Sequence, residues 1–130
     1  VEVDESLASA LAARLVGTNV EVIHGDATHT GLPDDRFSTA VCFAMLHHVR
    51  SPEQQDQVFA ELFRVLRPFG SLAGSDALDD ERTRRGHIDD VFVPINLDSF
   101  PTRLEAAGFS GVEIDMGEYD FRFHARKSIS

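Results

Sequence analysis

DRFSTAVCFAMLHHVR, residues 35–50, is the stretch of sequence that decides the fold. Positions 40–46 within it form an unbroken apolar run of seven residues without alternation. A run this short that contains Val and Phe favours a strand, and its lack of alternation predicts that both faces of the strand are covered, as in the interior of a parallel sheet. His47 and His48 come directly after it. Because ligands bind at the carboxyl ends of strands in open α/β sheets, we expect a central strand with a site at its end.

Helical patterns occur on both sides of this strand. The first follows Asp4, whose side chain can cap a helix. Leucines at four-residue spacing give this helix one apolar face: Leu7, Leu11 and Leu15. The second helix opens at Ser51, with proline at its first position, and ends before Pro68. A third is expected over 98–107, with its first residue, an aspartate, as the cap.

Further strands are expected from short apolar or alternating segments. These are residues 1–3, 20–23, 71–75, 112–116 and 119–125. The last two alternate across a tight connection, which predicts an antiparallel pair. The charged segment 79–90 is predicted to be a solvated loop or helix. Because strands alternate with helices before the final pair, we expect one α/β domain over 1–130 with a mostly parallel sheet closed by an antiparallel pair.

Composition excludes several classes of function. The formal net charge of −10 argues against a non-specific nucleic-acid binder and against a protein that binds anionic membranes. The sequence carries no leader pattern and no apolar stretch near the length of a membrane span, so we expect a cytoplasmic protein. A single cysteine, Cys42, excludes a disulfide within one chain and is expected to be a small buried hydrophobe.

Two acidic residues follow expected strands and are candidates for a nucleoside site. Glu2 could accept hydrogen bonds from ribose hydroxyls, or it could be only a surface or capping group. Asp26 stands in Gly25-Asp26-Ala27, where its carboxylate could accept from an adenine amino group while the Ala27 amide donates to the ring. The alternative for Asp26 is a turn aspartate that bonds its own backbone.

The paired histidines allow more than one interpretation. His47 or His48 is chemically apt as an acid or base near neutral pH, and a packed, hydrogen-bonded histidine is the alternative. Neighbouring residues on an extended segment point to opposite sides, so the two histidines are not expected to share a metal ion. No residue is therefore assigned to a metal.

Taken in order, five stretches resemble the class I S-adenosylmethionine-dependent methyltransferases, in the small-molecule branch that is similar to methyltransferase domain 11. The stretches are VEVD at 1–4, GDAT at 25–28, LPDDRFSTAVCFAMLHHV at 32–49, ELFRVLRPFGSL at 61–72 and LEAAGFSGVEI at 104–114. The resemblance covers nearly the whole chain and implies a Rossmann-like fold, S-adenosyl-L-methionine as cofactor and a small-molecule methyl acceptor.

The resemblance also implies roles for individual residues. The cofactor ribose would be bound by Glu2, its adenine by Asp26 and Ala27, and its methionine part by Phe43, Ala44 and Met45. His47 and His48 would lie near the methyl-transfer site, and His48 or His47 would act as a base where the acceptor must lose a proton. The segment 87–96 would lie over the substrate pocket.

The chain departs from the family in two places. Phe69 stands where the family usually has a glycine. The family's first strand and glycine-rich loop are also missing, and no G-x-G-x-x-G occurs. Loss of that strand would leave open sheet edges at 1–3 and 40–46, which a second copy of the chain could pair with. The alternatives to a truncated methyltransferase are therefore an inactive, dimerising remnant of the fold, and a nicotinamide-dependent oxidoreductase, which needs the same absent glycine motif.

Overall fold

A mixed four-stranded sheet forms the centre of the protein. The computed structural model describes residues 1–88 and 90–128, and Asp89, Ile129 and Ser130 lie outside the described residues. The sheet order is β1-β2-β4-β3, comprising β1 (Phe37–Phe43), β2 (Leu66–Ala77), β4 (Asp120–Arg126) and β3 (Ser110–Met116). β1 and β2 are parallel, whereas β4 runs antiparallel to both β2 and β3. The predicted α/β class and the closing antiparallel pair are confirmed.

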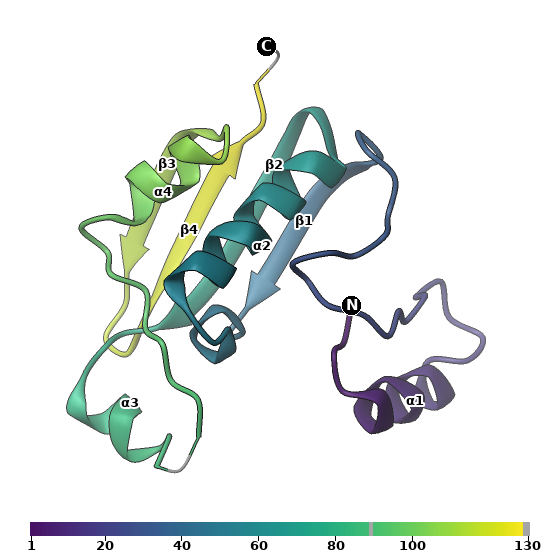
Figure 1. Ribbon diagram of the computed structural model, residues 1–130, viewed down its shortest axis with the longest axis horizontal. Helices are drawn as coiled ribbons and strands as arrows, with labels where there is room; N and C mark the ends of the chain where they lie inside the picture. Colours follow the sequence, from purple (N-terminus) through teal and green to yellow (C-terminus); the bar gives the residue numbers. More distant parts are fainter. Residues whose placement is uncertain (89, 129–130) are drawn as a thin grey trace.

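Two helices cover one face of this sheet, α2 (Pro52–Val65) and α4 (Phe100–Ala106) (Figure 1). α2 begins as predicted, because the Ser51 hydroxyl accepts from the Gln54 amide at 3.1 Å. Phenylalanines fill the layer between helices and sheet: the Phe100 ring lies 5.7 Å from Phe59 and 5.0 Å from Phe123, measured between centroids. The alternation in β4 therefore has the predicted meaning, with one face of the strand buried in this core.

β1 lies at the edge of the sheet, and the prediction that both its faces are covered is wrong. Val41 is 55% exposed and Phe43 64% exposed, and Cys42 is the buried residue of the strand. β2 occupies one edge of β1, and no strand among the described residues pairs with the other. The expected open edge at β1 is therefore confirmed. The apolar side chains Val41 and Phe43 are exposed because none of the described residues covers them.

The N-terminal segment lies beside that open edge, away from α2 and α4 (Figure 1). Asp4 caps α1 (Glu5–Arg14) as predicted, accepting from the Leu7 amide at 2.9 Å. The expected apolar face of α1 is largely uncovered, because Leu7 is 57% exposed and Ala8 is the buried residue. In place of the strands expected at 1–3 and 20–23, the described residues form one parallel bridge, between Glu2 and His24.

Two element boundaries also differ from the sequence prediction. β2 follows α2 without a turn, and Pro68 lies inside the strand at a shift of register opposite β1. Phe69 there has φ 68° and is 66% exposed. α4 begins after Ser99 rather than Asp98, because the Asn96 side chain accepts from the Asp98 amide at 2.9 Å and forms the turn before the helix.

The charged segment that begins at position 79 contains one short helix, α3 (Glu81–Arg85), which is solvated as predicted. Of the helices in residues 1–88 and 90–128, none has the length and apolar character needed to cross a membrane.

Candidate active site

The bridge between Glu2 and His24 brings the two acidic candidates to one end of the N-terminal segment. The Gly25 amide donates to the Glu2 carbonyl at 2.9 Å, so Asp26 follows directly on this contact. One oxygen of Asp26 accepts from the amide and from the hydroxyl of Thr28, both at 2.8 Å. The amide bond, followed by the hydroxyl bond, holds the pKa of Asp26 below its ordinary value. The turn interpretation of Asp26 is thus realised through Oδ1, and among the described residues Oδ2 accepts no hydrogen bond.

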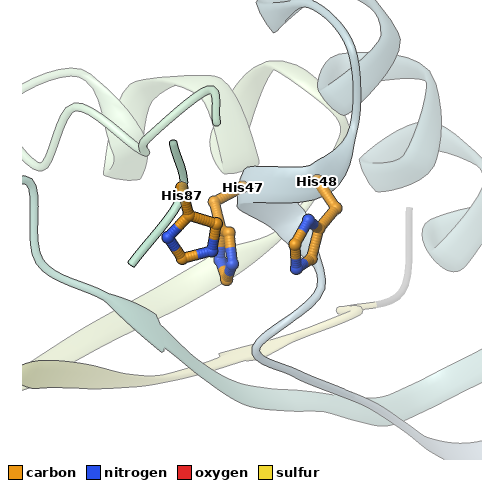
Figure 2. Close-up of side chains that lie close together, drawn as sticks. All are labelled: His47, His48 and His87. Carbon is orange, nitrogen blue, oxygen red and sulfur yellow. The ribbon is translucent and has the colours of Figure 1, made fainter. Parts of the chain in front are cut away.

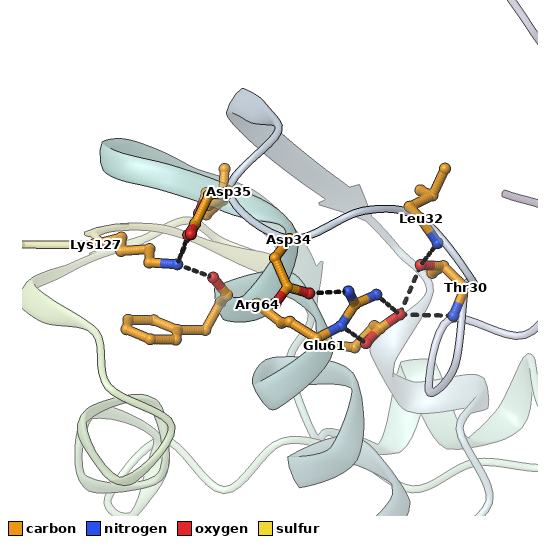
Figure 3. Close-up of polar contacts among 9 residues, drawn as sticks. Thr30, Leu32, Asp34, Asp35, Glu61, Arg64 and Lys127 are labelled. Atoms are coloured by element: carbon orange, nitrogen blue, oxygen red, sulfur yellow. Dashed lines mark hydrogen bonds and ion pairs between the residues drawn. The ribbon is translucent and has the colours of Figure 1, made fainter.

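The loop after Asp26 is anchored to helix α2 by a buried glutamate (Figure 3). The Thr30 amide and hydroxyl both donate to Glu61 Oε2 at 2.6 Å. Arg64 donates to the other oxygen at 2.8 Å and also binds Asp34. The Arg64 contact, together with the Thr30 bonds, lowers the pKa of Glu61 to about 2. This network fixes the loop after Asp26 to helix α2.

β1 ends in an abrupt change of direction. Phe43 is exposed, and Ala44 has φ 52°, a left-handed conformation that is uncommon for residues other than glycine. The Ala44 amide donates to the Ser75 carbonyl at 2.9 Å, which secures the turn. Met45 packs against the core, and a short 3-10 helix, η1 (Leu46–His48), follows. Since these residues are helical, the expectation that His47 and His48 sit on an extended segment is wrong.

His47 is buried and bound to Asp76, which lies at the carboxyl end of β2. His47 Nδ1 contacts Asp76 Oδ1, and the His47 amide donates to Oδ2 at 3.1 Å. An ionised carboxylate only accepts, so Nδ1 carries the hydrogen and the lone pair of the neutral ring is on Nε2. Sequence reasoning missed Asp76, although its place near the end of the neighbouring strand was the available clue.

His48 and His87 complete a group of three imidazoles (Figure 2). The His47 ring centroid lies 4.1 Å from that of His48 and 4.9 Å from that of His87. His87 follows α3 and stacks on Phe92 with centroids 4.9 Å apart. The resemblance named His87 only as the start of a segment over the substrate pocket, so its place in this group was not anticipated.

The fully buried Gln55 side chain of α2 joins the turn that bears His47 to the segment after α3. Its amide nitrogen donates to the carbonyls of Leu46, at 3.0 Å, and Val93, at 2.8 Å. Its oxygen accepts from Arg103 of α4 at 3.0 Å. The Val93 amide in turn donates to the His47 carbonyl at 2.8 Å. Two walls of the site are therefore fixed to each other through one side chain.

Cys42 lies on β1 beside this site but is chemically quiet. Burial, together with the charge of Asp76, raises the pKa of the Cys42 thiol to about 12. The thiol therefore remains protonated at neutral pH and is a poor nucleophile, because the thiolate is the reactive form. This agrees with the prediction that Cys42 acts as a small hydrophobe.

The predicted site residues thus fall into two groups. Glu2 and Asp26 lie at the end of the N-terminal bridge, whereas Phe43, Met45 and His47 lie at the end of β1. Ala27 and Met45 both pack against the same core cluster. An open depression of about 610 Å³ lies near the end of β2. Pro94, Ile95 and Asn96, which belong to the segment 87–96 expected over the substrate pocket, line part of it. Asp89 of that segment lies outside the described residues.

Comparison with known proteins places the chain among methyltransferases. The family model described as "Methyltransferase domain" matches residues 1–74, more than half of the chain. Methyltransferase GfsG of Streptomyces halstedii is 30% identical over 103 residues, which cover 68% of this chain and 34% of that protein. The chain thus spans about a third of the length of this relative.

Solved structures with the same fold agree with this match. A SAM-dependent methyltransferase from Thermotoga maritima superposes with a TM-score of 0.80 at 17% identity, covering 98% of this chain and 72% of that one. A SAM-dependent methyltransferase from Methanosarcina mazei gives 0.73 at 18% identity, covering 99% and 81%. A methyltransferase bound to the Trm112 activator of Haloferax volcanii gives 0.79 at 11% identity, covering 98% and 70%. From the match of the family model and of the Streptomyces relative, the chain belongs to the methyltransferase domain family.

Proposed function

We propose that this domain transfers a methyl group from S-adenosyl-L-methionine to a small-molecule acceptor, and that His47 takes the acceptor's proton. The observation that carries the proposal is the buried contact between His47 and Asp76 at the carboxyl ends of two parallel strands. Methyl transfer is a displacement, so the enzyme mainly has to position the reactants. A positioned base contributes about 10²–10⁴-fold where the acceptor must lose a proton.

The proposed roles of the two residues follow from their hydrogen bonds. S-adenosyl-L-methionine would supply an electrophilic methyl group to an oxygen or nitrogen of the acceptor, with S-adenosylhomocysteine as the leaving group. The acceptor's proton passes to Nε2 of His47, which the bond from Nδ1 to Asp76 leaves as the basic nitrogen. Asp76 orients the ring and stabilises the imidazolium, so Asp76 is a positioning residue. His48, half exposed beside His47, is the second candidate base.

The residues proposed to bind the cofactor fit it in part. Within residues 1–88 and 90–128, Asp26 Oδ2 accepts no hydrogen bond, so it is available to an adenine amino group. The Ala27 amide donates no hydrogen bond to these residues either, so it is available to the adenine ring. The Glu2 carboxylate accepts from the Asp4 amide at 3.1 Å, through one of its two oxygens. The exposed Phe43 and Ala44 at the end of β1, with the half-buried Met45 after them, support a contact with the methionine part. S-adenosyl-L-methionine supplies an electrophilic methyl group when bound, and these residues would orient it.

Calorimetric titration with S-adenosylhomocysteine tests the cofactor part of the proposal. We expect micromolar binding to the chain. Asp26→Ala should weaken it by about 1.5–3 kcal/mol, the range for a lost hydrogen bond to a charged group. Asp115→Ala is the matched control. Asp115 is an exposed residue of β3 that pairs with Arg122 of β4, and its loss should leave the affinity for S-adenosylhomocysteine unchanged. A folded chain that does not bind S-adenosylhomocysteine would overturn the proposal.

The role of His47 is tested by turnover against small hydroxyl and amine compounds, measured as release of S-adenosylhomocysteine. His47→Gln should lower kcat by about 10²–10⁴-fold while the affinity for S-adenosylhomocysteine stays within twofold. Equal losses in kcat and in cofactor affinity would contradict a role as base, because such a change would indicate a disturbed site rather than a missing proton acceptor.

The open edge of β1 favours a second candidate function, a dimerising module. Natural edge strands are usually protected by charged side chains, by proline or by a covering element. β1 has no charged residue over Phe37–Phe43, and Val41 is 55% exposed. We propose that two copies pair their β1 edges antiparallel across a two-fold axis, which would continue the sheet from one copy into the next.

Sedimentation velocity over the micromolar range tests this pairing. The chain should sediment as a dimer, and Val41→Lys should sediment as a monomer because it places a charge at the centre of the paired edges. Met116→Lys, at an exposed position on β3, is the control and should remain dimeric. A monomeric wild-type chain would remove this candidate function.

A further inference from the structure

The three imidazoles at the end of β1 are arranged as a set of metal ligands. His47 and His48 come from η1, and His87 comes from the segment after α3 (Figure 2). One ring nitrogen of each residue lies within 4.8 Å of the corresponding nitrogens of the other two. The three rings therefore converge on one point although His87 is far from the pair in the sequence.

In two of the three rings, a hydrogen bond at Nδ1 leaves the Nε2 lone pair available to a metal ion. His87 Nδ1 lies 2.8 Å from the Thr83 carbonyl, which can only accept, so Nδ1 carries the hydrogen and Nε2 the lone pair. The contact of His47 Nδ1 with Asp76 has the same effect. A histidine that binds a metal ion almost always donates its other ring hydrogen to a carboxylate or a carbonyl, and these are the two partners found here.

We propose that His47, His48 and His87 bind a divalent transition-metal ion, with Zn²⁺ as the best-suited ion. Imidazole ligands suit Zn²⁺ and its first-row neighbours, whereas Mg²⁺ and Ca²⁺ prefer carboxylate and carbonyl oxygens. Three protein ligands leave a fourth position of the tetrahedron open to water or to a small molecule. The proposal does not depend on methyl transfer, because binding the ion needs neither cofactor nor acceptor.

The geometry needs a modest closure of the rings around the ion. Zn–N distances of about 2.0–2.1 Å place tetrahedral ligand nitrogens roughly 3.3 Å apart. His47 is buried and fixed by Asp76, whereas the His48 side chain is 48% exposed and can rotate towards it. Asp90 Oδ2 lies 3.8 Å from His48 Nδ1, so a carboxylate flanks the site and favours a bound cation.

Occupancy by a metal ion would exclude the proposed base. The ion would take the Nε2 lone pair of His47, which is the lone pair that would accept a proton from the methyl acceptor. The metal-bound and proton-accepting forms of His47 are therefore mutually exclusive, and Zn²⁺ would act as an inhibitor that competes at this nitrogen.

The test is calorimetric titration of Zn²⁺ into the chain, prepared without a histidine tag and dialysed against a chelator. We expect one ion per chain with micromolar affinity. Co²⁺, followed by its visible absorption, reports the ligand set independently of activity. His48→Ala and His87→Ala should each weaken Zn²⁺ binding at least tenfold, and neither removes the buried imidazole. His29→Ala, at an exposed histidine in the turn after Asp26, is the matched control and should stay within twofold.

The outcomes separate the metal site from its alternatives. Tenfold losses in both site variants with an unchanged control would support the site. Absence of Zn²⁺ binding by the folded chain would overturn it, and so would binding that both site variants leave intact. The Zn²⁺ titration contains no S-adenosylhomocysteine. A failure to bind Zn²⁺ would therefore not count against the proposed methyl transfer, which is tested separately.

Discussion

Glu61→Gln is the substitution whose consequence can be worked out most fully from the structure. The side chain is 6% exposed, binds Arg64 and Thr30, and its pKa is about 2 against an ordinary 4.5. A difference of about 2.5 units, at 1.36 kcal/mol each, corresponds to about 3 kcal/mol. Because the Arg64 side chain is 35% exposed, solvent screening reduces this, and we expect a loss of about 1.5–2 kcal/mol in the free energy of unfolding at pH 7.

The loss should depend on pH in a defined direction. The pKa of Glu61 is lowered by folding, so its stabilising contribution is complete above about pH 4.5 and is lost as the pH falls towards 2. The difference between wild type and Glu61→Gln should therefore shrink to less than half by about pH 3. Urea unfolding at both pH values measures it, with exposed Glu105→Gln as the control. A gap that is absent at pH 7, or equal at pH 7 and pH 3, would refute the reasoning.

Three further substitutions test the packing that positions the site. Gly74→Ala would drive a Cβ into the Cys42 carbonyl oxygen, so β2 must shift and thermal unfolding should show a loss of about 1–3 kcal/mol; an unchanged Tm would contradict this close approach. Phe100→Ala empties a fully buried position and should cost about 3–5 kcal/mol in urea unfolding, and a smaller cost would mean that α4 collapses into the space. Ser51→Ala removes the cap contact to Gln54 and should lower the free energy of unfolding by about 1 kcal/mol, whereas no loss would mean that water replaces the cap.

The features predicted correctly from the sequence are those set by neighbouring residues. The Ser51-Pro52 start of α2 is local, because the cap contacts an amide three residues away. The alternation of Phe121 and Phe123 gives the buried face of β4 by the period of the strand alone. The order of the motifs was sufficient for the family, since each short stretch retains its place along the chain.

The features that were missed depend on distant partners. Whether β1 is covered on both faces depends on which elements reach it, and the apolar run at 40–46 carries no information about that. Asp76 reaches His47 across 29 residues because their strands are parallel neighbours. The expectation that His47 and His48 point to opposite sides rested on an extended chain, but the left-handed Ala44 is followed by a 3-10 helix in which the two rings lie side by side.

The three hydrogen bonds of Gln55 have a consequence for how this site could diversify. Its amide joins the turn that carries His47 to the segment around Val93, yet Gln55 belongs to α2 and is fully buried. A shorter side chain at this position would let the two walls part without altering any residue that lines them. The distance between these two walls therefore depends on a buried residue of the helix behind them.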